Sequence, residues 1–157
     1  MWFYVLGAAV VGVDRFAKWF VTHHRHDGPL LGDLLRLSLT ENSGAAFGML
    51  VGARAALVAV SAGAAVALVI ANHTLRSGDP RRPWLALLLG GNLGNLVDRV
   101  RTGHVVDFLD MGVGSHRWPV YNLADMAIVA GAAGLAVLLR RELVRGGAPA
   151  DATGDPR

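Results

Sequence analysis

The sequence has no cysteine and few charged residues. The absence of cysteine excludes disulfides, thiol catalysis and zinc sites built on cysteine. Charged residues make up 17% of the chain, whereas an ordinary soluble domain carries about 25%. Since 53% of the residues are hydrophobic and occur in long blocks, the shortage of charge indicates a protein that has the bilayer as its solvent.

The signatures of serine and metal hydrolases are also missing. Neither G-x-S-x-G nor H-E-x-x-H occurs, and the serines have no suitable histidine and aspartate partners. His23, His24 and His26 have no carboxylate at ligand spacing, so we interpret them as a solvated loop. We therefore expect no metal and no cofactor.

Basic residues are present, with a net charge of +3, but their placement does not suit nucleic acid. The arginines flank the hydrophobic blocks, as membrane-flanking charges do, and form no stripe with interleaved aromatic residues. We expect contact with membrane lipids and no nucleic-acid binding.

Four apolar blocks, each near the roughly 20 residues that cross a bilayer core, predict four transmembrane helices. We expect the first to be a retained helix and not a signal peptide, because it lacks a basic start and charged residues interrupt it. We expect a mainly α, polytopic membrane protein with a single domain over residues 1–145 and a disordered cytoplasmic tail over 146–157. The blocks run over about Met1–His23, Met49–Ala71, Trp84–Val100 and Val120–Leu139.

The segments between these blocks fall on alternate sides of the membrane. Loops at about 23–48 and 102–119 share one side, and a compact polar turn over Asn72–Arg82 lies on the other. Residues 36–40 alternate polar and apolar, which predicts a strand of a small sheet at the membrane surface. We predict a mixed loop over Phe108–Pro119, placed where a lid would lie.

Antiparallel helices bring the polar residues of this sequence to one rim of the bundle. Polar groups in hydrocarbon are costly, so their convergence indicates a functional site. Arginines mark the opposite side, which by the positive-inside tendency is cytoplasmic together with both termini. The rim residues are Asp14, Lys18, Glu41, Asn42, Asn95, Asp98, Arg99, Asp107, Asn122 and Asp125.

Asp107 and Asp125 are the candidates for chemistry. Two neighbouring carboxylates share one proton, so one can activate water while the other polarises a peptide carbonyl. Each has a plainer interpretation that remains open at this point. The spacing of Asn122 and Asp125 is also that of a helix N-cap with an acid three residues on, and Asp107 fits a solvated acid beyond a helix end.

The other rim residues also have two interpretations. Asn95, Asp98 and Arg99 share one helix face, either to bind substrate or to pair buried charges. Asp14 and Lys18, four residues apart, predict a structural ion pair. Asn42 begins a run of small residues through Gly48, which suits either the approach of a substrate backbone or a capped entry into the second helix.

These segments together resemble the bacterial lipoprotein signal peptidases, or signal peptidase II. The matches occur in the family's order and cover the chain from the first to the fourth helix. Departures are modest: Arg15, Ala17, Asn92 and Tyr121 replace the family's usual residues. The matching segments are Asp14 to Lys18, Asn42 to Phe47, Gly94 to Arg99, Gly103 to Phe108 and Asn122 to Asp125.

The resemblance implies an inner-membrane aspartic peptidase with a small periplasmic sheet and a short periplasmic helical element. It implies cleavage of diacylglyceryl-modified prolipoproteins just before the lipid-modified cysteine and inhibition by the cyclic peptide globomycin. We expect the protein to act as a monomer. The implied catalytic dyad is Asp107 and Asp125. Substrate would be held by Asn42, Gly44, Asn95, Arg99 and Asn122, with Asp14, Lys18 and Asp98 supporting the site.

Two other classes of function are open to such a chain. A small transporter or channel subunit also uses intramembrane acids, although acids gathered at one rim do not thread the bilayer. A catalytically inactive lipoprotein-binding protein would not need acids at both dyad positions.

Overall fold

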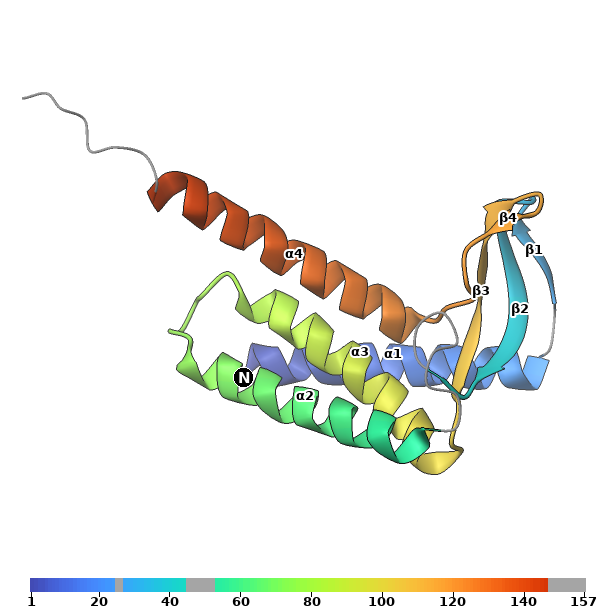
Figure 1. Ribbon diagram of the computed structural model, residues 1–157, viewed down its shortest axis with the longest axis horizontal. Helices are drawn as coiled ribbons and strands as arrows, with labels where there is room; N and C mark the ends of the chain where they lie inside the picture. Colours follow the sequence, from blue (N-terminus) through green and yellow to red (C-terminus); the bar gives the residue numbers. More distant parts are fainter. Residues whose placement is uncertain (25–26, 45–52, 147–157) are drawn as a thin grey trace, which may run out of the picture.

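The computed structural model describes residues 1–24, 27–44 and 53–146, and Figure 1 shows their arrangement. Four long helices occur where the four apolar blocks predict them. The helices are α1 (Trp2–His24), α2 (Arg54–Thr74), α3 (Arg82–Arg101) and α4 (Leu123–Gly146). The strands are β1 (Gly28–Leu31), β2 (Leu35–Asn42), β3 (Val105–Val113) and β4 (His116–Arg117).

The helix ends differ from the predicted bounds for local reasons. Helix α3 begins at Arg82, ahead of Pro83, because proline is tolerated in a first turn whose N–H groups have no helical partner. Helix α4 starts only after its cap residue, Asn122, and continues beyond Leu139. The predicted start of the second helix at Met49, and the small-residue run after Gly44, lie outside the described residues.

The small antiparallel sheet has the strand order β1-β2-β3-β4. The predicted strand over residues 36–40 is confirmed within β2. The prediction of a loop over Phe108–Pro119 is wrong, because β3 extends to Val113 and a turn leads into β4. The backbone of β3 pairs with β2, which lies far away in the sequence, with Leu37 opposite Leu109 and Thr40 opposite Asp107. That distant partner, and not local pattern, makes this segment a strand.

Two further predictions need correction. Asn42 does not cap the second helix, whose N-cap is Ala53; it ends β2 instead. Residues 1–24, 27–44 and 53–146 contain no helix besides α1–α4, so the short helical element implied by the resemblance is not found in this part of the chain. The predicted tail lies outside the described residues from residue 147 onward.

Helix α3 is the centre of the helical part and contacts α1, α2 and α4. Glycines permit this close packing: a Cβ on Gly91 would lie 2.3 Å from the carbonyl oxygen of Ala124, and one on Gly90 would lie 2.7 Å from that of Gly7. The sheet lies at the end of the bundle where α1 ends and α4 begins (Figure 1). Buried Val21, Phe108 and Leu109 join it to α1.

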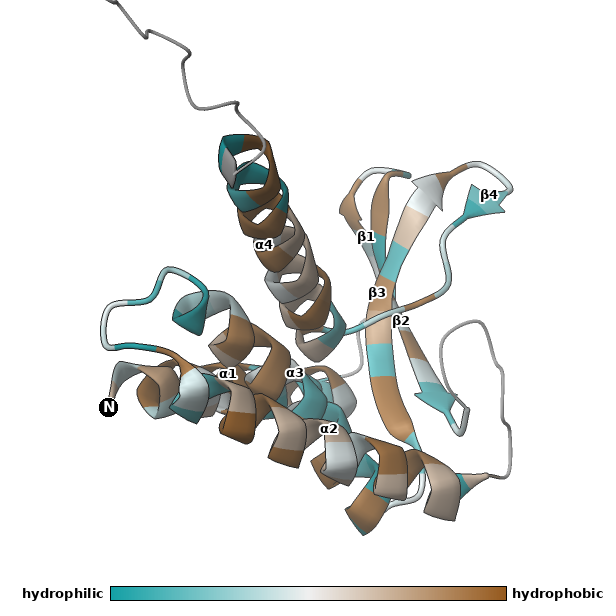
Figure 2. Cartoon of the chain, turned by 60° about the vertical axis from the view of Figure 1, so that its left-hand side comes forward, coloured by the Kyte–Doolittle hydropathy of each residue, from teal (hydrophilic) through white to brown (hydrophobic). Residues whose placement is uncertain are grey.

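The helices consist largely of hydrophobic residues (Figure 2). Among the described helices, two pass a length-and-composition test for a membrane span, Arg54–Thr74 and Leu123–Arg145, with mean hydropathies of 2.1 and 1.8. Val60, Val66 and Ile70 on α2 are 58–71% exposed. An exposed apolar surface of this extent fits a protein embedded in a membrane.

Candidate active site

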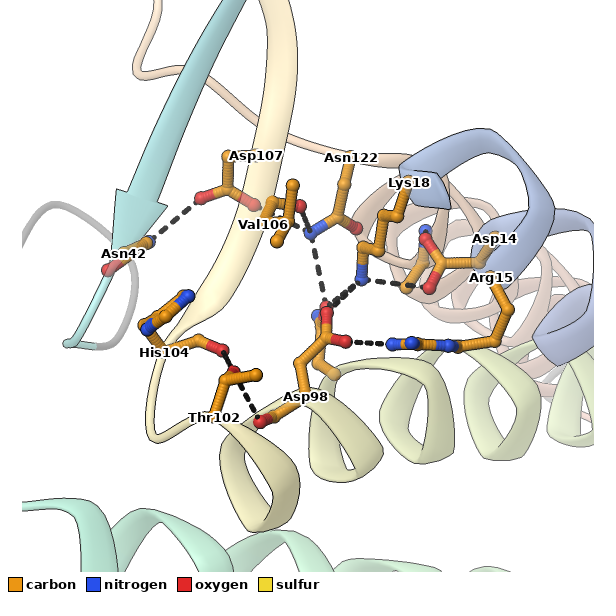
Figure 3. Close-up of polar contacts among 12 residues, drawn as sticks. Asp14, Arg15, Lys18, Asn42, Asp98, Thr102, His104, Val106, Asp107 and Asn122 are labelled. Carbon is orange, nitrogen blue, oxygen red and sulfur yellow. Dashed lines mark hydrogen bonds and ion pairs between the residues drawn. The ribbon is translucent and has the colours of Figure 1, made fainter. Parts of the chain in front are cut away.

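Asp107 lies on β3, where the sheet meets the ends of the helices (Figure 3). Its carboxylate accepts one hydrogen bond from Asn42 Nδ2 at 3.0 Å and another from Asn122 Nδ2 at 2.6 Å. The residue is only 3% exposed. The interpretation of Asp107 as a solvated acid is therefore wrong.

Asp125 occupies the first turn of α4 and takes part in a reciprocal cap. Asn122 Oδ1 accepts a hydrogen bond from the Asp125 backbone N–H at 2.9 Å, and the Asn122 N–H donates to Asp125 Oδ2 at 3.2 Å. The capping interpretation is thus confirmed. The other oxygen, Oδ1, accepts a hydrogen bond from Asn95 Nδ2 at 2.7 Å, so the cap leaves this oxygen facing the remaining polar residues.

Asn122 connects the two acids. Its side chain donates to Asp107, and its backbone N–H and side-chain oxygen both bond to Asp125. The residue is completely buried. Since a buried amide needs its hydrogen bonds satisfied, Asn122 holds both carboxylates in a defined relation.

A cluster of buried charges supports this arrangement from the side of α1 (Figure 3). The ammonium of Lys18 lies 2.8 Å from Asp14 Oδ2 and 2.7 Å from Asp98 Oδ2. Arg15 forms an ion pair with the other oxygen of Asp98. Two acids and two bases balance one another, and the predicted ion pair of Asp14 with Lys18 is confirmed.

Lys18 also determines how Asn95 is oriented. Its ammonium donates to Asn95 Oδ1 at 3.2 Å, and Asn122 Nδ2 donates to the same oxygen at 3.1 Å. Lysine has no acceptor, so the amide oxygen of Asn95 must face it. The amide N–H₂ of Asn95 therefore faces Asp125.

Asp14 binds the N-terminus of α4 as well. Its Oδ1 accepts a hydrogen bond from the backbone N–H of Ala124 at 3.0 Å, satisfying one of the unpaired donors of the helix start. A Cβ on Gly94 would lie 2.8 Å from Asp14 Oδ2, so a glycine is required where α3 passes this carboxylate. Contacts from α1 and α3 thus position the turn that carries Asp125.

Arg99 and Gly44 meet at the end of β2. The guanidinium of Arg99 donates to the carbonyl oxygen of Gly44 at 3.1 Å, while the Gly44 N–H donates to Asn42 Oδ1 at 3.0 Å. Within the described part of the chain, the buried Nε of Arg99 has no hydrogen-bond partner. Arg99 also lines the cavity that holds both acids.

Arg54 is a residue of this region that sequence reasoning missed. From the start of α2 it donates to the carbonyl oxygens of Arg99 at 2.9 Å and Val100 at 2.7 Å, at the end of α3. A basic residue beside unpaired helix carbonyls is favourable. Its place at the edge of an apolar block resembles an ordinary flanking charge, so the sequence carried no signal of this contact.

Burial raises the pKa of Asp107 from 3.8 to about 6, and the nearby charge of Asp125 adds to this effect. The hydrogen bond from Asn42, together with that from Asn122 and the charge of Lys18, lowers the pKa of Asp107 again and limits the rise. Such an acid changes its protonation near neutral pH, as a group that transfers protons must.

Both acids line one cavity of about 980 Å³. Its wall near the sheet is polar, with Asn42, Asp107 and Asp125. Its wall between α2 and α4 is mainly apolar, with Leu57, Val60, Ile128 and Val129. The two walls are complementary to a peptide whose polar cleavage site lies next to an apolar segment.

No group of residues suited to a metal ion occurs in the described ranges 1–24, 27–44 and 53–146. The prediction of a solvated histidine loop needs correction, because His23 and His24 belong to the last turn of α1. Their rings contact those of Trp19 and Phe20. His26 lies outside the described residues.

Solved structures share this fold. One protein, described as a bacterial membrane enzyme, superposes with a TM-score of 0.82 over 93% of this chain and 92% of its own, at 24% identity. Another, described in the same way, has a TM-score of 0.75 and 26% identity, with 86% and 90% of the two chains covered.

Sequence comparison identifies the family. The lipoprotein signal peptidase of Moorella thermoacetica is 41% identical over 133 residues, which cover 82% of this chain and 86% of that protein. The lipoprotein signal peptidase of Brevibacillus brevis is 37% identical over 135 residues, with 83% and 89% covered. The model of the signal peptidase (SPase) II family matches residues 6–141. The chain therefore belongs to the signal peptidase II family.

Proposed function

We propose that this chain removes the signal peptide from diacylglyceryl-modified prolipoproteins by cleaving just before the lipid-modified cysteine, with Asp107 and Asp125 as its catalytic pair. Membership of the family supports the reaction. One observation carries the assignment of the residues: both acids line a single cavity and are joined through the buried amide of Asn122.

In this proposal Asp107 holds the proton that the pair shares, because its pKa is raised to about 6. A substrate that fills the cavity displaces water and raises this pKa further. Ionised Asp125 takes a proton from water, whose oxygen forms a bond to the scissile carbonyl carbon while Asp107 donates its proton to the carbonyl oxygen. The C–N bond then breaks as the leaving amine takes the proton from Asp125, while a hydroxyl of the tetrahedral intermediate returns a proton to Asp107. No metal is needed.

The amide and guanidinium groups around the pair hold the substrate backbone in this proposal. Asn42, Asn95 and Asn122 give the carboxylates their N–H donors. Asn42 and Asn95 also line the cavity, whereas Asn122 is completely buried and acts through the two acids that it holds. Arg99, which lines the cavity, binds a substrate carbonyl through its guanidinium, and Gly44 permits the backbone to approach closely. Asp14, Lys18 and Asp98 keep α1, α3 and α4 in register beneath the site.

The same proposal places all four helices across the bacterial inner membrane. The site then lies near the outer face, and both termini and the tail are cytoplasmic, with residues 1–145 as one domain that acts as a monomer. The charged residues in the interior of α1, and Asp98 and Arg99 on α3, belong to the site or its supporting cluster, which supports four spans. Acyl chains then reach the cavity from the lipid, and a cyclic peptide such as globomycin would occupy it as an inhibitor.

A cleavage assay tests the function and the pair together. Purified protein in detergent should cleave a diacylglyceryl-modified prolipoprotein before the lipid-bearing cysteine, and Asp107→Asn and Asp125→Asn should each lose at least about 10³-fold in rate. Asp110→Asn is the matched control, since Asp110 lies on the same strand but pairs with Arg117 outside the cavity.

Loss in the two dyad variants with cleavage retained in the control supports the assignment. Normal hydrolysis by either dyad variant would refute it. Binding of the substrate by folded wild-type protein without cleavage would favour the inactive binding protein. The transporter alternative is disfavoured because the buried acids gather at one end of the helices, while α2 has no charged residue beyond Arg54.

A further inference from the structure

Asn92 places a polar group in the mainly apolar wall of the cavity. It precedes Asn95 by three residues on α3, so it lies on the same face and about 4.5 Å farther along the helix from the catalytic acids. Val60, Ser61 and Ile128 line the same cavity. The resemblance to the family predicts a small residue at this position, so the amide distinguishes this chain.

The orientation of this amide follows from one contact. Asn92 Nδ2 donates a hydrogen bond to the backbone carbonyl oxygen of Ser61 on α2 at 2.8 Å. A carbonyl only accepts, so the N–H₂ must face α2 and the amide oxygen must face the other way. Within the described residues, no protein group donates to this oxygen.

An acceptor in an apolar wall selects what binds beside it. Acyl chains have no donor, and their ester groups only accept, so the lipid part of the substrate does not satisfy this oxygen. The peptide backbone at the scissile bond lies by the acids, about one helical turn away, which is a distance that a side chain spans. The group that fits is the hydroxyl of a serine or threonine close to the scissile bond.

We infer that Asn92 is a specificity-determining residue, whose amide oxygen accepts a hydrogen bond from a serine or threonine hydroxyl in the signal peptide. The inference rests on the proposed function and goes beyond it by naming a preference within the substrate. Asn92 is half-buried in the cavity wall, so a bound substrate displaces the water that its oxygen otherwise meets. A substrate with alanine in place of serine then leaves this acceptor unpaired, which disfavours that substrate.

Paired synthetic lipopeptides test this preference. Each pair carries alanine or serine at one of the three positions before the lipid-modified cysteine, and kcat/KM is measured with wild type, Asn92→Ala and Asn92→Leu. Wild type should prefer serine by about fivefold at one position, and the preference should disappear in both variants. Asn92→Leu keeps the approximate volume of the side chain, so it separates hydrogen bonding from the shape of the cavity.

The ratio between two peptides is insensitive to general damage, because a loosened protein loses rate on both. The inference would be overturned if wild type cleaves the alanine and serine peptides of every pair equally well, or if a serine preference persists in both variants. Either result would leave the proposed function intact. Failure of folded wild type to cleave any peptide would overturn both.

Discussion

At the scale of single residues, the site depends on which atoms of each amide face which neighbour. The sequence leaves open which groups Asn42, Asn95 and Asn122 bond to, and in the structure each donates an N–H to one of the two acids. Lys18 and the α4 cap leave Asn95 and Asn122 only one orientation. The carboxylates therefore keep a defined set of partners before a substrate arrives.

The donor on Asn42 leads to a prediction on pH. Its hydrogen bond stabilises ionised Asp107 and lowers the pKa of that carboxyl, which burial raises to about 6. Since the proposed mechanism needs the proton on Asp107, kcat/KM of wild type should fall about tenfold per pH unit above pH 6. In Asn42→Ala the pKa of Asp107 rises further, so the fall should begin at higher pH.

The measurement is a pH–rate profile of both proteins with one lipopeptide, with thermal unfolding in detergent as a check on folding. A purely structural role for Asn42 would lower the rate at every pH equally. A fall that begins at lower pH in the variant would contradict the assigned direction.

At the scale of elements, glycines on α3 let three helices meet at the site. A side chain at Gly91 would collide with the Ala124 carbonyl oxygen and with Ile128, both on α4, close to Asp125. That carbonyl is backbone, so relief requires the start of α4 to move. The distance between the helices is thus coupled to the geometry of the acid pair.

Replacement of Gly91 by alanine should lower both the unfolding temperature and the cleavage rate. Overpacking of this kind costs about 1–3 kcal/mol, and displacement of Asp125 should reduce the rate by more than tenfold. Gly63→Ala is the matched control, since Gly63 on α2 has nothing within 4 Å of an added Cβ. Unfolding temperatures and kcat/KM of both variants in detergent test this prediction. Equal values for the two variants would show that α4 moves to accommodate the added methyl group without loss of stability or rate.

The strands show where the local sequence pattern was insufficient to predict secondary structure. Residues 36–40 alternate clearly, and the predicted strand is found in β2. Residues 108–119 contain two glycines and scattered polar residues, which pointed to a loop. Their strand conformation depends on hydrogen bonds to β2, about seventy residues earlier in the chain, as the pairing of Arg36 with Asp110 illustrates.

At the scale of the whole molecule, the proposed topology puts the sheet and the turn between α2 and α3 on opposite sides of the membrane. Figure 1 shows this turn and the sheet at opposite ends of the helical part. Exposed serines mark both ends, Ser77 in the turn and Ser115 between β3 and β4.

Because the chain has no cysteine, single substitutions report the topology directly. An impermeant maleimide should label Ser115→Cys in intact spheroplasts and should label Ser77→Cys only after the membrane is opened. Labelling of both after opening is the control for accessibility. If only Ser77→Cys is labelled in intact spheroplasts, the orientation is the reverse of the proposed one. If both variants are labelled in intact spheroplasts, the result argues against the four spans.

The amino-acid sequence by itself determined the helices, the end of the bundle where polar residues gather, and the candidate acids. Long apolar blocks and the alternation of antiparallel helices carry that information, because both follow from the order of residues along the chain. The family motifs added the roles that we propose for these residues.

Only the tertiary structure decided how the groups of the site face one another. The capping of α4 by Asp14, the contact of Arg54 with α3 and the free amide oxygen of Asn92 all join residues that are distant in sequence. No local pattern specifies such pairs, because the direction of a hydrogen bond depends on which acceptor or donor the packed neighbour supplies. Buried polar groups must find partners, and the fold determines which partners are within reach.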